Sequence, residues 1–208
     1  MDELVEAVDH NGHPIGVIGR KLANRIGVWH FCAQVFVLVT LDDEPAVVFQ
    51  RRPRTKSVSP GVLDISASGH VTFGQTVQAA ALREVEEELG LHFTEDDLVH
   101  VGRRIDMYEA PGVLSRIFAE VYVARSSVDV ANFKYDRDEI EELVVIPASK
   151  LADVFARGIP ATCIAFSPDQ HGENSERTIE VTASEFLPRM DNLYYRIARY
   201  ALNDNYIL

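Results

Sequence analysis

The sequence has few cysteines and no long hydrophobic segment. Its 208 residues include two cysteines, Cys32 and Cys163, which excludes a disulfide framework. The longest apolar run, 31–40, is interrupted by Gln34 and is too short to cross a bilayer. The first residues are acidic and lack the basic and apolar regions of a signal peptide. These absences predict a soluble protein of the reducing cytoplasm with no membrane partner.

Positive charge is also scarce. The chain carries 20 Lys and Arg residues against 32 Asp and Glu residues, a formal net charge of −12. This balance excludes a general nucleic-acid binder, because such proteins need a basic surface. A phosphorylated ligand would therefore need a local basic patch or a bound cation. The apolar share of 47% and the charged share of 25% are ordinary for a globular protein and exclude disorder.

Hydrophobic patterns predict helices mixed with antiparallel strands, without the regular strand–helix alternation of a parallel sheet, and hence an α+β fold. We expect a hairpin around Asn11-Gly12, a common hairpin turn. The expected strands span 4–9, 14–18, 31–40, 46–49, 98–108, 114–125 and 142–146. The expected helices span 76–89, 149–156 and about 186–203, and the expected irregular segments span 19–29, 50–62 and 168–178.

The predicted helix 76–89 carries an unusual group of carboxylates. Glu84, Glu87 and Glu88 are spaced i, i+3 and i+4, so they lie on one helical face. Like charges at this spacing destabilise a helix by about 0.2–0.5 kcal/mol per pair, and Arg83 offsets only part of this. Either the face is simply solvated, or it holds a hard divalent cation, for which carboxylate oxygens are suitable ligands.

The segment from Gly69 to Leu91 resembles the Nudix box, G-x5-E-x7-R-E-U-x-E-E-x-G-U, where U is apolar. Every specified position matches except one, because Gln75 stands where the box has its first glutamate. The resemblance extends over residues 4–167 and implies an α/β/α sandwich around a mixed sheet. We therefore expect residues 1–208 to form a single Nudix domain. Its expected parts are a core at about 28–160, an N-terminal hairpin at 4–18 and a C-terminal helix at about 186–203.

This resemblance implies roles for particular residues. Glu84, Glu87, Glu88 and the backbone carbonyl of Ser68 correspond to ligands of Mg²⁺, with Mn²⁺ as the alternative. Arg83 corresponds to the arginine that orients the glutamates, so Arg83, Glu87 and Glu88 are the expected catalytic residues. The implied reaction is hydrolysis of a diphosphate linkage, which makes the protein a hydrolase of phosphorus-containing acid anhydrides. The general base stays open between Glu88 and a glutamate of 138–142.

A basic cluster precedes the Nudix-like segment. Residues 50–56 contain four positive charges and no negative charge, in a chain that is acidic as a whole. We expect Arg51, Arg52 and Lys56 to bind the substrate diphosphate, since Arg and Lys are the usual phosphate ligands. Strand alternation would direct only one of the two neighbouring arginines toward the site, and Arg51 is the expected one. The alternative is that the cluster is a solvated loop.

Parts of the chain also resemble isopentenyl-diphosphate isomerases and their hydrolase relatives within the Nudix superfamily. His30 and His70 match two metal-binding histidines of those isomerases. Other isomerase residues are missing, because Ser68 replaces the catalytic cysteine and Ile164 replaces a tryptophan. The segment 114–118 contains no glutamate where the isomerases have their second acid. The sequence therefore favours an isomerase-like hydrolase over an isomerase.

Three functions remain open at this point. The favoured one is a Mg²⁺-dependent diphosphohydrolase that acts on a nucleoside diphosphate derivative or a related small molecule. The second is an isopentenyl-diphosphate isomerase-like activity. The third is a weakly active diphosphate-binding module, which Gln75 favours. The group attached to the diphosphate is open, with Tyr108, Tyr122 and Tyr135 as candidates for stacking on a base. The C-terminal helix would cover its own domain or a second copy, so a homodimer is also open.

Overall fold

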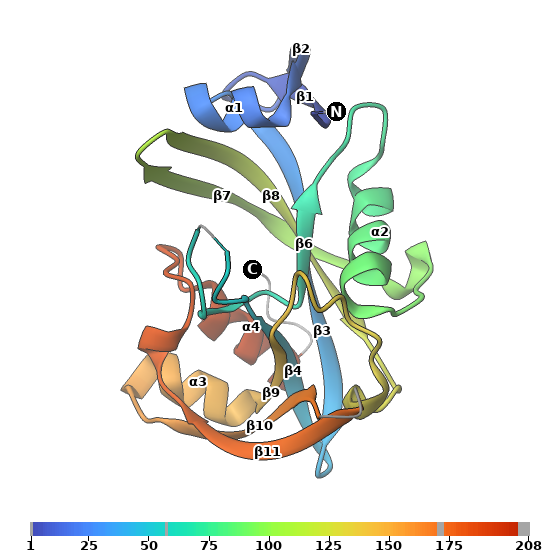
Figure 1. Cartoon of the computed structure of the whole chain (residues 1–208), viewed down its shortest axis with the longest axis vertical. Helices are drawn as coiled ribbons and strands as arrows, with labels where there is room; N and C mark the ends of the chain where they lie inside the picture. Colours follow the sequence, from blue (N-terminus) through green and yellow to red (C-terminus); the bar gives the residue numbers. More distant parts are fainter. Residues whose placement is uncertain (1, 57, 170–172, 204–208) are drawn as a thin grey trace.

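The structure, a computed structural model, describes residues 2–56, 58–169 and 173–203 (Figure 1). The strands are β1 (Leu4–Val8), β2 (Pro14–Gly19), β3 (His30–Leu41), β4 (Glu44–Arg51), β5 (Leu63–Asp64), β6 (Ala67–His70), β7 (Val99–Ala110), β8 (Val113–Arg125), β9 (Glu142–Pro147), β10 (Ala161–Pro168) and β11 (Asn174–Val181). The helices are α1 (Arg20–Ile26), α2 (Val77–Leu89), α3 (Ala148–Arg157) and α4 (Leu193–Leu202), with short 3-10 turns η1 (Glu95–Asp97), η2 (Val130–Asn132) and η3 (Ala183–Glu185). The predicted α+β class is confirmed.

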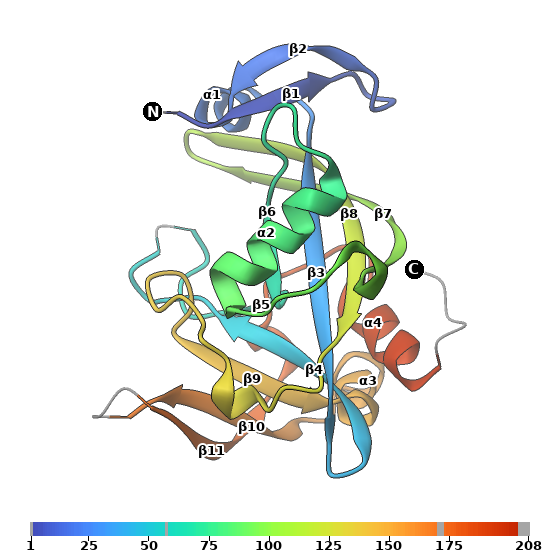
Figure 2. The same ribbon diagram turned by 90° about the vertical axis from the view of Figure 1, so that its right-hand side faces the viewer.

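A mixed sheet forms the centre of the fold. In the described part of the chain its strands follow the order β11-β10-β9-β4-β3-β8-β7, while β5 pairs with β4 and β6 pairs with β3. Strand β3 runs parallel to β8 and antiparallel to β4. Helix α2 packs on one face of the sheet, and α3 and α4 pack on the other. Figure 2 shows α2 in front of β3 and β6.

The alternation of β3 distributes its side chains between the two faces. Phe36 and Leu38 join the core under α3 and α4, whereas Val35 and Val37 join the core under α2. Because both faces are covered, the strand is almost continuously apolar in sequence. The same alternation places Gln34 on the side of Phe36, where the core gives way to a pocket.

Helix α2 begins and ends at the residues that its sequence predicts. The Thr76 hydroxyl accepts a hydrogen bond from the Ala79 backbone N–H, with an N···O distance of 3.1 Å, and so caps the N-terminus. Gly90 ends the helix in the left-handed region, with φ of 67°. Val85 and Leu89 are fully buried against the sheet. This leaves the glutamate face of α2 beside the pocket.

Two segments that we expected to be irregular are regular. Residues 20–26 form α1, which is too short to show a clear helical period and ends at Gly27, with φ of 75°. Strand β11 includes residues 174–178 of the expected loop 168–178 and forms an antiparallel hairpin with β10. The side chains of β11 are mostly exposed and polar. A strand at the edge of a sheet therefore shows little of the apolar alternation that would reveal it.

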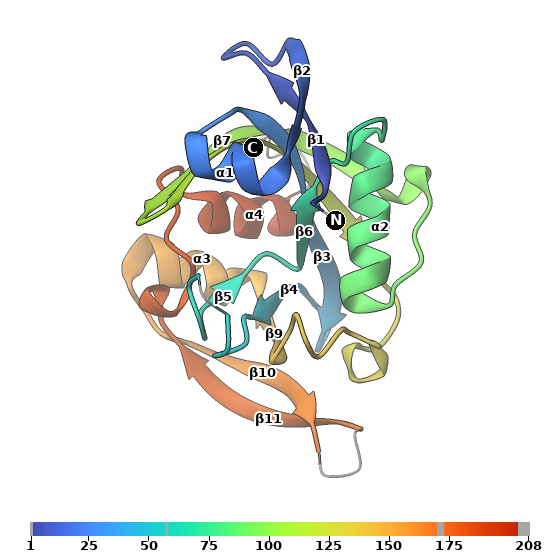
Figure 3. The same ribbon diagram turned by 45° about the horizontal axis from the view of Figure 1, so that its top comes forward.

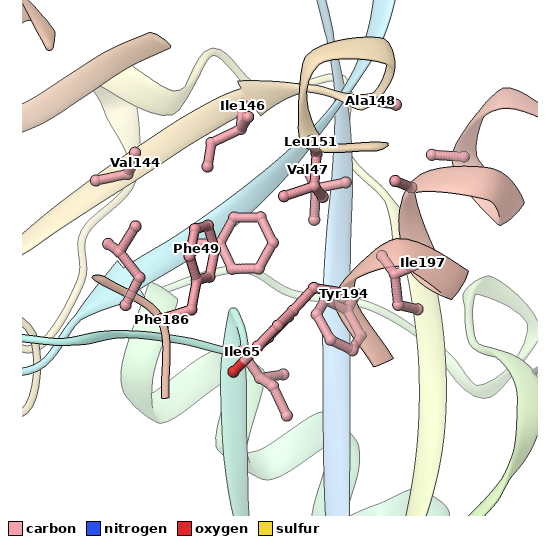
Figure 4. Close-up of a cluster of buried hydrophobic side chains, with 14 of the residues drawn as sticks. Val47, Phe49, Ile65, Val144, Ile146, Ala148, Leu151, Phe186, Tyr194 and Ile197 are labelled. Carbon is pink, nitrogen blue, oxygen red and sulfur yellow. The ribbon is translucent and has the colours of Figure 1, made fainter. Parts of the chain in front are cut away.

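The C-terminal helix starts later than expected. Helix α4 begins at Leu193, after Pro188 and after Asn192, whose φ of 53° is incompatible with a helix. The residues before it, 186–192, form an irregular segment that crosses the sheet edge near β5, where the Leu187 N–H donates to the Leu63 carbonyl at 2.8 Å. Phe186 packs edge-on against Phe49, with ring centroids 5.2 Å apart (Figure 4). This contact holds the C-terminal segment 186–192 beside the pocket.

The predicted N-terminal hairpin is confirmed. Strands β1 and β2 form a separate two-stranded sheet with a turn at Asn11-Gly12, where Gly12 has φ of 85°. Figure 3 shows this hairpin projecting from the body beside α1. It is held to the loop before α2 by a hydrogen bond from the Phe73 N–H to the Leu4 carbonyl, at 2.8 Å. None of the helices within the described ranges has the length and apolar character needed to cross a membrane.

Candidate functional site

A pocket of about 830 Å³, here called the main pocket, lies beside the glutamate face of α2. Its walls come from α2, β6, β3, the loop after β4, the segment before β9, the β7–β8 hairpin and the C-terminal segment 186–192. The charged residues that line it are Glu3, Arg20, Arg52, Lys56, Arg83, Glu84, Glu87, Glu88, Asp106, Asp136, Glu139 and Arg189. The fold thus brings acidic and basic segments that are distant in the sequence around one cavity.

Glu84 and Glu88 form a buried acidic wall of the main pocket. The side chain of Glu84 is only 12% exposed. Glu88 accepts hydrogen bonds from the Gln50 side chain at 3.2 Å and from the Ser68 backbone N–H at 3.3 Å, both neutral donors. Burial, together with the charge of Glu84, raises the pKa of Glu88 to about 8. Burial also raises the pKa of Glu84.

The close approach of α2 to β6 depends on Gly69. A Cβ atom at position 69 would lie 1.8 Å from the Oε1 atom of Glu84, far inside van der Waals contact. Glycine is therefore required for Glu84 to lie against the backbone of β6. The glycine and the glutamate of the Nudix-like segment thus act as one unit, and this accounts for their fixed spacing.

Arg83 links two of the three predicted metal ligands. Its guanidinium lies 2.7 Å from Glu84 and 2.9 Å from Glu87, and it also donates to the His70 carbonyl at 3.1 Å. The orienting role that the Nudix resemblance implies for Arg83 stays a prediction. The side chain of Glu87 is 59% exposed and lies at the rim of the main pocket. In residues 2–56, 58–169 and 173–203, no three His, Cys, Asp or Glu side chains already converge as a metal centre.

A divalent cation would stabilise the ionised carboxylate of Glu88 in its present surroundings. A buried carboxylate that receives only neutral hydrogen bonds is poorly compensated, which is why its pKa is raised. A cation beside Glu84 and Glu88 would offset this cost, and carboxylate oxygens are the ligands that Mg²⁺ prefers. Glu87 would join them only by turning away from Arg83.

Arg52 and Lys56 also line the main pocket. Arg52 donates to the Val58 carbonyl at 3.2–3.3 Å and lies 3.6 Å from Asp64. The Nζ atom of Lys56 lies 2.7 Å from the Glu139 carboxylate. Both side chains are about one quarter exposed, at 26% and 27% respectively, so an anion in the pocket can reach them.

Arg51 does not line the main pocket, and our expectation that it faces the site is wrong. Its side chain is 11% exposed and pairs with Glu142 at 2.6 Å and with Glu185 at 3.3 Å. Arg51 follows the alternation of β4, which places it on the same face as Phe49, under the C-terminal segment. Arg52 lies just beyond the end of β4 and turns toward the pocket. The solvated-loop alternative is also wrong for Arg51, which is buried.

One glutamate of the segment 138–142 lies in the main pocket. Glu139 lines it and pairs with Lys56, whereas Glu141 pairs with Arg54 outside it. Glu142 is buried in its ion pair with Arg51. Of the glutamates that the sequence offered as a general base, Glu88 and Glu139 are therefore the ones beside the pocket.

Our sequence interpretation missed Arg189 and Asp106, which also line the main pocket. The guanidinium of Arg189 pairs with Asp64 at 2.8 Å and with Asp106, and its side chain is 9% exposed. Burial alone would lower the pKa of Arg189, but these two carboxylates raise it. Burial disfavours the charged form of Asp106, yet Arg189 and Arg104 hold its pKa below the usual range. No motif in the sequence indicates these contacts.

The histidine pair and Gln75 differ in their relation to the pocket. His30 is fully buried, while His70 lines the pocket and stacks on His30 with ring centroids 5.1 Å apart. Gln75 lies outside the main pocket, in a recess with Phe73 and Val77. The replacement of the family glutamate by Gln75 therefore removes no carboxylate from the main pocket.

Comparisons with known proteins show which family this chain resembles. Residues 30–162 match the NUDIX domain. The chain is 26% identical to an uncharacterized Nudix hydrolase of Clostridium acetobutylicum, over 99% of both proteins. It is 31% identical to an isopentenyl-diphosphate Delta-isomerase of Streptomyces griseus, over 74% of this chain and 76% of that protein. The crystal structure of DR0079 from Deinococcus radiodurans has a TM-score of 0.54 and 25% identity, and the match covers 75% of this chain and 90% of that one.

Proposed function

Because this chain belongs to the Nudix hydrolase family, we propose that it is a divalent-metal-dependent diphosphohydrolase. Its substrate would be a nucleoside diphosphate derivative or a related small molecule with a diphosphate linkage. The observation that carries this proposal is the arrangement of charge in one pocket. The largely buried carboxylates Glu84 and Glu88 and the cations Arg52, Lys56 and Arg189 line the same pocket. A metal beside Glu84 and Glu88 would offset the excess of carboxylates in this lining, and it would attract a diphosphate to the same pocket.

The acidic wall would hold the metal. Glu84, Glu88 and the Ser68 carbonyl are the groups that would bind Mg²⁺ or Mn²⁺, with Glu87 as a further ligand. Such an ion neutralises phosphate oxygens and lowers the pKa of a bound water. Gly69 keeps Glu84 close to β6, and Arg83 holds the orientation of Glu84 through their ion pair.

The basic wall would hold the diphosphate. Arg52 offers a guanidinium that can bind two phosphate oxygens at once, and Lys56 offers a point charge. Transition-state charge in phosphoryl transfer lies on these oxygens, so fixed cations lower the barrier. Glu139, held by Lys56, is in a position to accept a proton from the attacking water, with Glu88 as the alternative base.

The similarity to isopentenyl-diphosphate Delta-isomerases supports a second candidate activity. Ser68 is a poor replacement for a cysteine acid, because a hydroxyl is much less acidic than a thiol. Cys32 does line the main pocket, but burial raises the pKa of its thiol. The residues of this pocket therefore favour hydrolysis.

A substrate screen tests both candidates. The purified full chain is incubated with nucleoside diphosphates, dinucleotides, nucleotide sugars and isopentenyl diphosphate, with and without Mg²⁺, and the products are measured by chromatography. We expect cleavage of a diphosphate linkage that needs Mg²⁺ and is abolished by a chelator. Isopentenyl diphosphate in D₂O should show no deuterium uptake. Folded protein that cleaves nothing with Mg²⁺ or Mn²⁺ would refute the hydrolase, and clear deuterium uptake would establish the isomerase instead.

A further inference from the structure

A second cavity, here called the side recess, adjoins the main pocket. It has a volume of about 340 Å³. The two cavities share five lining residues, namely Arg52, His70, Asp106, Ile117 and Arg189. The side recess and the main pocket therefore adjoin each other along these residues.

The β7–β8 hairpin forms one wall of the side recess. Val113, Ser115 and Ile117 alternate along β8, so they lie on one face, and all three line the recess. Tyr108 of β7 pairs with Ser115 in the sheet and lines the same recess. The loop after β4 and the C-terminal segment supply the other walls, including Val58, Leu187 and Pro188. Figure 1 shows these three parts on the same side of the molecule.

The charges at the junction of the two cavities are already paired. Arg52 and Arg189 both contact Asp64, and Arg189 also contacts Asp106. Beyond the junction, the described lining of the side recess consists of apolar side chains with Tyr108 and a few neutral polar groups. A further phosphate or carboxylate there would meet the Asp106 carboxylate, and both arginines of the junction already pair with carboxylates. The side recess thus differs in chemistry from the main pocket.

Unpaired polar atoms concentrate around the side recess. Five buried side-chain atoms of the described residues lack a hydrogen-bond partner. Three of them belong to lining residues of the side recess: Asn24 Oδ1, His70 Nε2 and Arg189 Nε. Buried polar groups are normally paired, and exceptions call for a functional or solvent partner. A mostly apolar ligand that carries a few hydrogen-bonding atoms would suit this lining.

We propose that the side recess binds the organic group attached to the substrate diphosphate, and that this group is uncharged and largely apolar. This inference rests on the proposed function, because the main pocket must hold the diphosphate for the attached group to reach the recess. It narrows the substrate class to diphosphate esters of an apolar or aromatic group. Diphosphates whose attached group carries further negative charge would bind less well.

A pair of non-hydrolysable probes tests the recess directly. Methylenediphosphonate and its mono-octyl ester are titrated into the full-length protein with Mg²⁺, and Kd is measured by calorimetry. The octyl ester should bind at least about tenfold more tightly, because its chain leaves water for the apolar recess. Val113→Asp should remove this gain while it leaves the affinity for methylenediphosphonate unchanged. Ser115→Phe, which fills the recess, should do the same.

A matched control lies on the same hairpin. Ile105 is 58% exposed and belongs to the face of β7 opposite to Asp106, so Ile105→Asp should retain the octyl gain. The inference is overturned if the octyl chain gives no gain in the wild type, or if both recess variants keep the gain.

Turnover separates this inference from the proposed function. If the protein cleaves small diphosphates but the octyl chain does not increase the affinity, the proposed role of the side recess is wrong and the proposed hydrolase activity is supported. If the octyl chain increases the affinity and both recess variants remove this increase, the proposed role of the side recess is supported. If the protein then cleaves neither octyl diphosphate nor any other diphosphate, the proposed hydrolase activity is overturned.

Discussion

The carboxylate of Glu84 occupies the volume in which a side chain at position 69 would begin. Helix α2 and strand β6 can approach this closely only because residue 69 is glycine. Glu84 and its ion-pair partner Arg83 both line the main pocket. The contact therefore controls the position of a predicted metal ligand, and it can be tested by substitution.

Gly69→Ala should displace Glu84 and weaken both stability and metal binding. Insertion of a methyl group into a packed contact costs typically about 1–3 kcal/mol of unfolding free energy. Denaturant unfolding measures this cost, and Mg²⁺ titration of turnover measures the metal. In a Glu84→Ala background the same substitution should cost much less, because the clash partner is gone. Equal costs in the two backgrounds would contradict the contact.

Glu88→Gln should lower Mg²⁺-dependent turnover by about 10²-fold or more, because a charge is lost where phosphate charge must be neutralised. Glu87→Gln should also lower turnover if Glu87 turns from Arg83 to the metal. Glu86→Gln is the matched control, since Glu86 lies on the same helix with a 61% exposed side chain and pairs with His92. Steady-state kinetics and a thermal unfolding scan on each variant separate catalysis from folding. If Glu88→Gln retains the wild-type rate, the proposed metal site is wrong.

Arg52→Ala should mainly change KM, whereas Arg51→Ala should mainly change the free energy of unfolding. Loss of Arg52 should raise KM by about tenfold or more, the scale of a charge-assisted hydrogen bond to phosphate, with little change in stability. The loss should shrink at high salt, because salt screens the same attraction. Arg51→Ala should leave KM nearly unchanged but lower the unfolding free energy by about 1.5–3 kcal/mol, because the buried carboxylate of Glu142 would keep only its ion pair with the half-exposed Arg177. A raised KM with intact stability in Arg51→Ala would restore our original expectation.

The buried His30–His70 pair should make stability depend on pH. Burial lowers the pKa of His70 to about 3 and also lowers that of His30. In the unfolded chain both rings titrate near about 6.5, so the unfolded state takes up protons first as the pH falls. The contribution of these two neutral rings to the free energy of unfolding is therefore at its maximum above about pH 6.5. It decreases as the pH falls from there toward about pH 3.

Denaturant unfolding over this pH range measures the effect. His70→Gln should flatten the decline by up to about 1.4 kcal/mol per pH unit. His10→Gln, at an exposed position in the N-terminal hairpin, should leave the slope as in the wild type. A wild-type slope in His70→Gln would show that His70 is not kept neutral by burial.

Local patterns in the sequence were sufficient for the α+β class, the course of β3, the bounds of α2 and the grouping of Glu84 and Glu88. These features depend on helical and strand periods and on capping residues, which act over a few neighbouring positions. The same kinds of pattern did not predict helix α1 or strand β11. A seven-residue helix and an exposed edge strand bury too little apolar surface to show a period.

Only the tertiary structure decided which charges face the site. Arg51 and Arg52 are adjacent and chemically identical, and the C-terminal segment that covers the Phe49 face of β4 determines which of them is buried. Arg189 reaches the main pocket because Phe186 anchors that segment against Phe49. Such contacts join residues far apart in the chain, and no local pattern encodes them. The sequence by itself therefore specified helix α2 with its glutamate face, whereas long-range packing determined which other charged side chains line the main pocket.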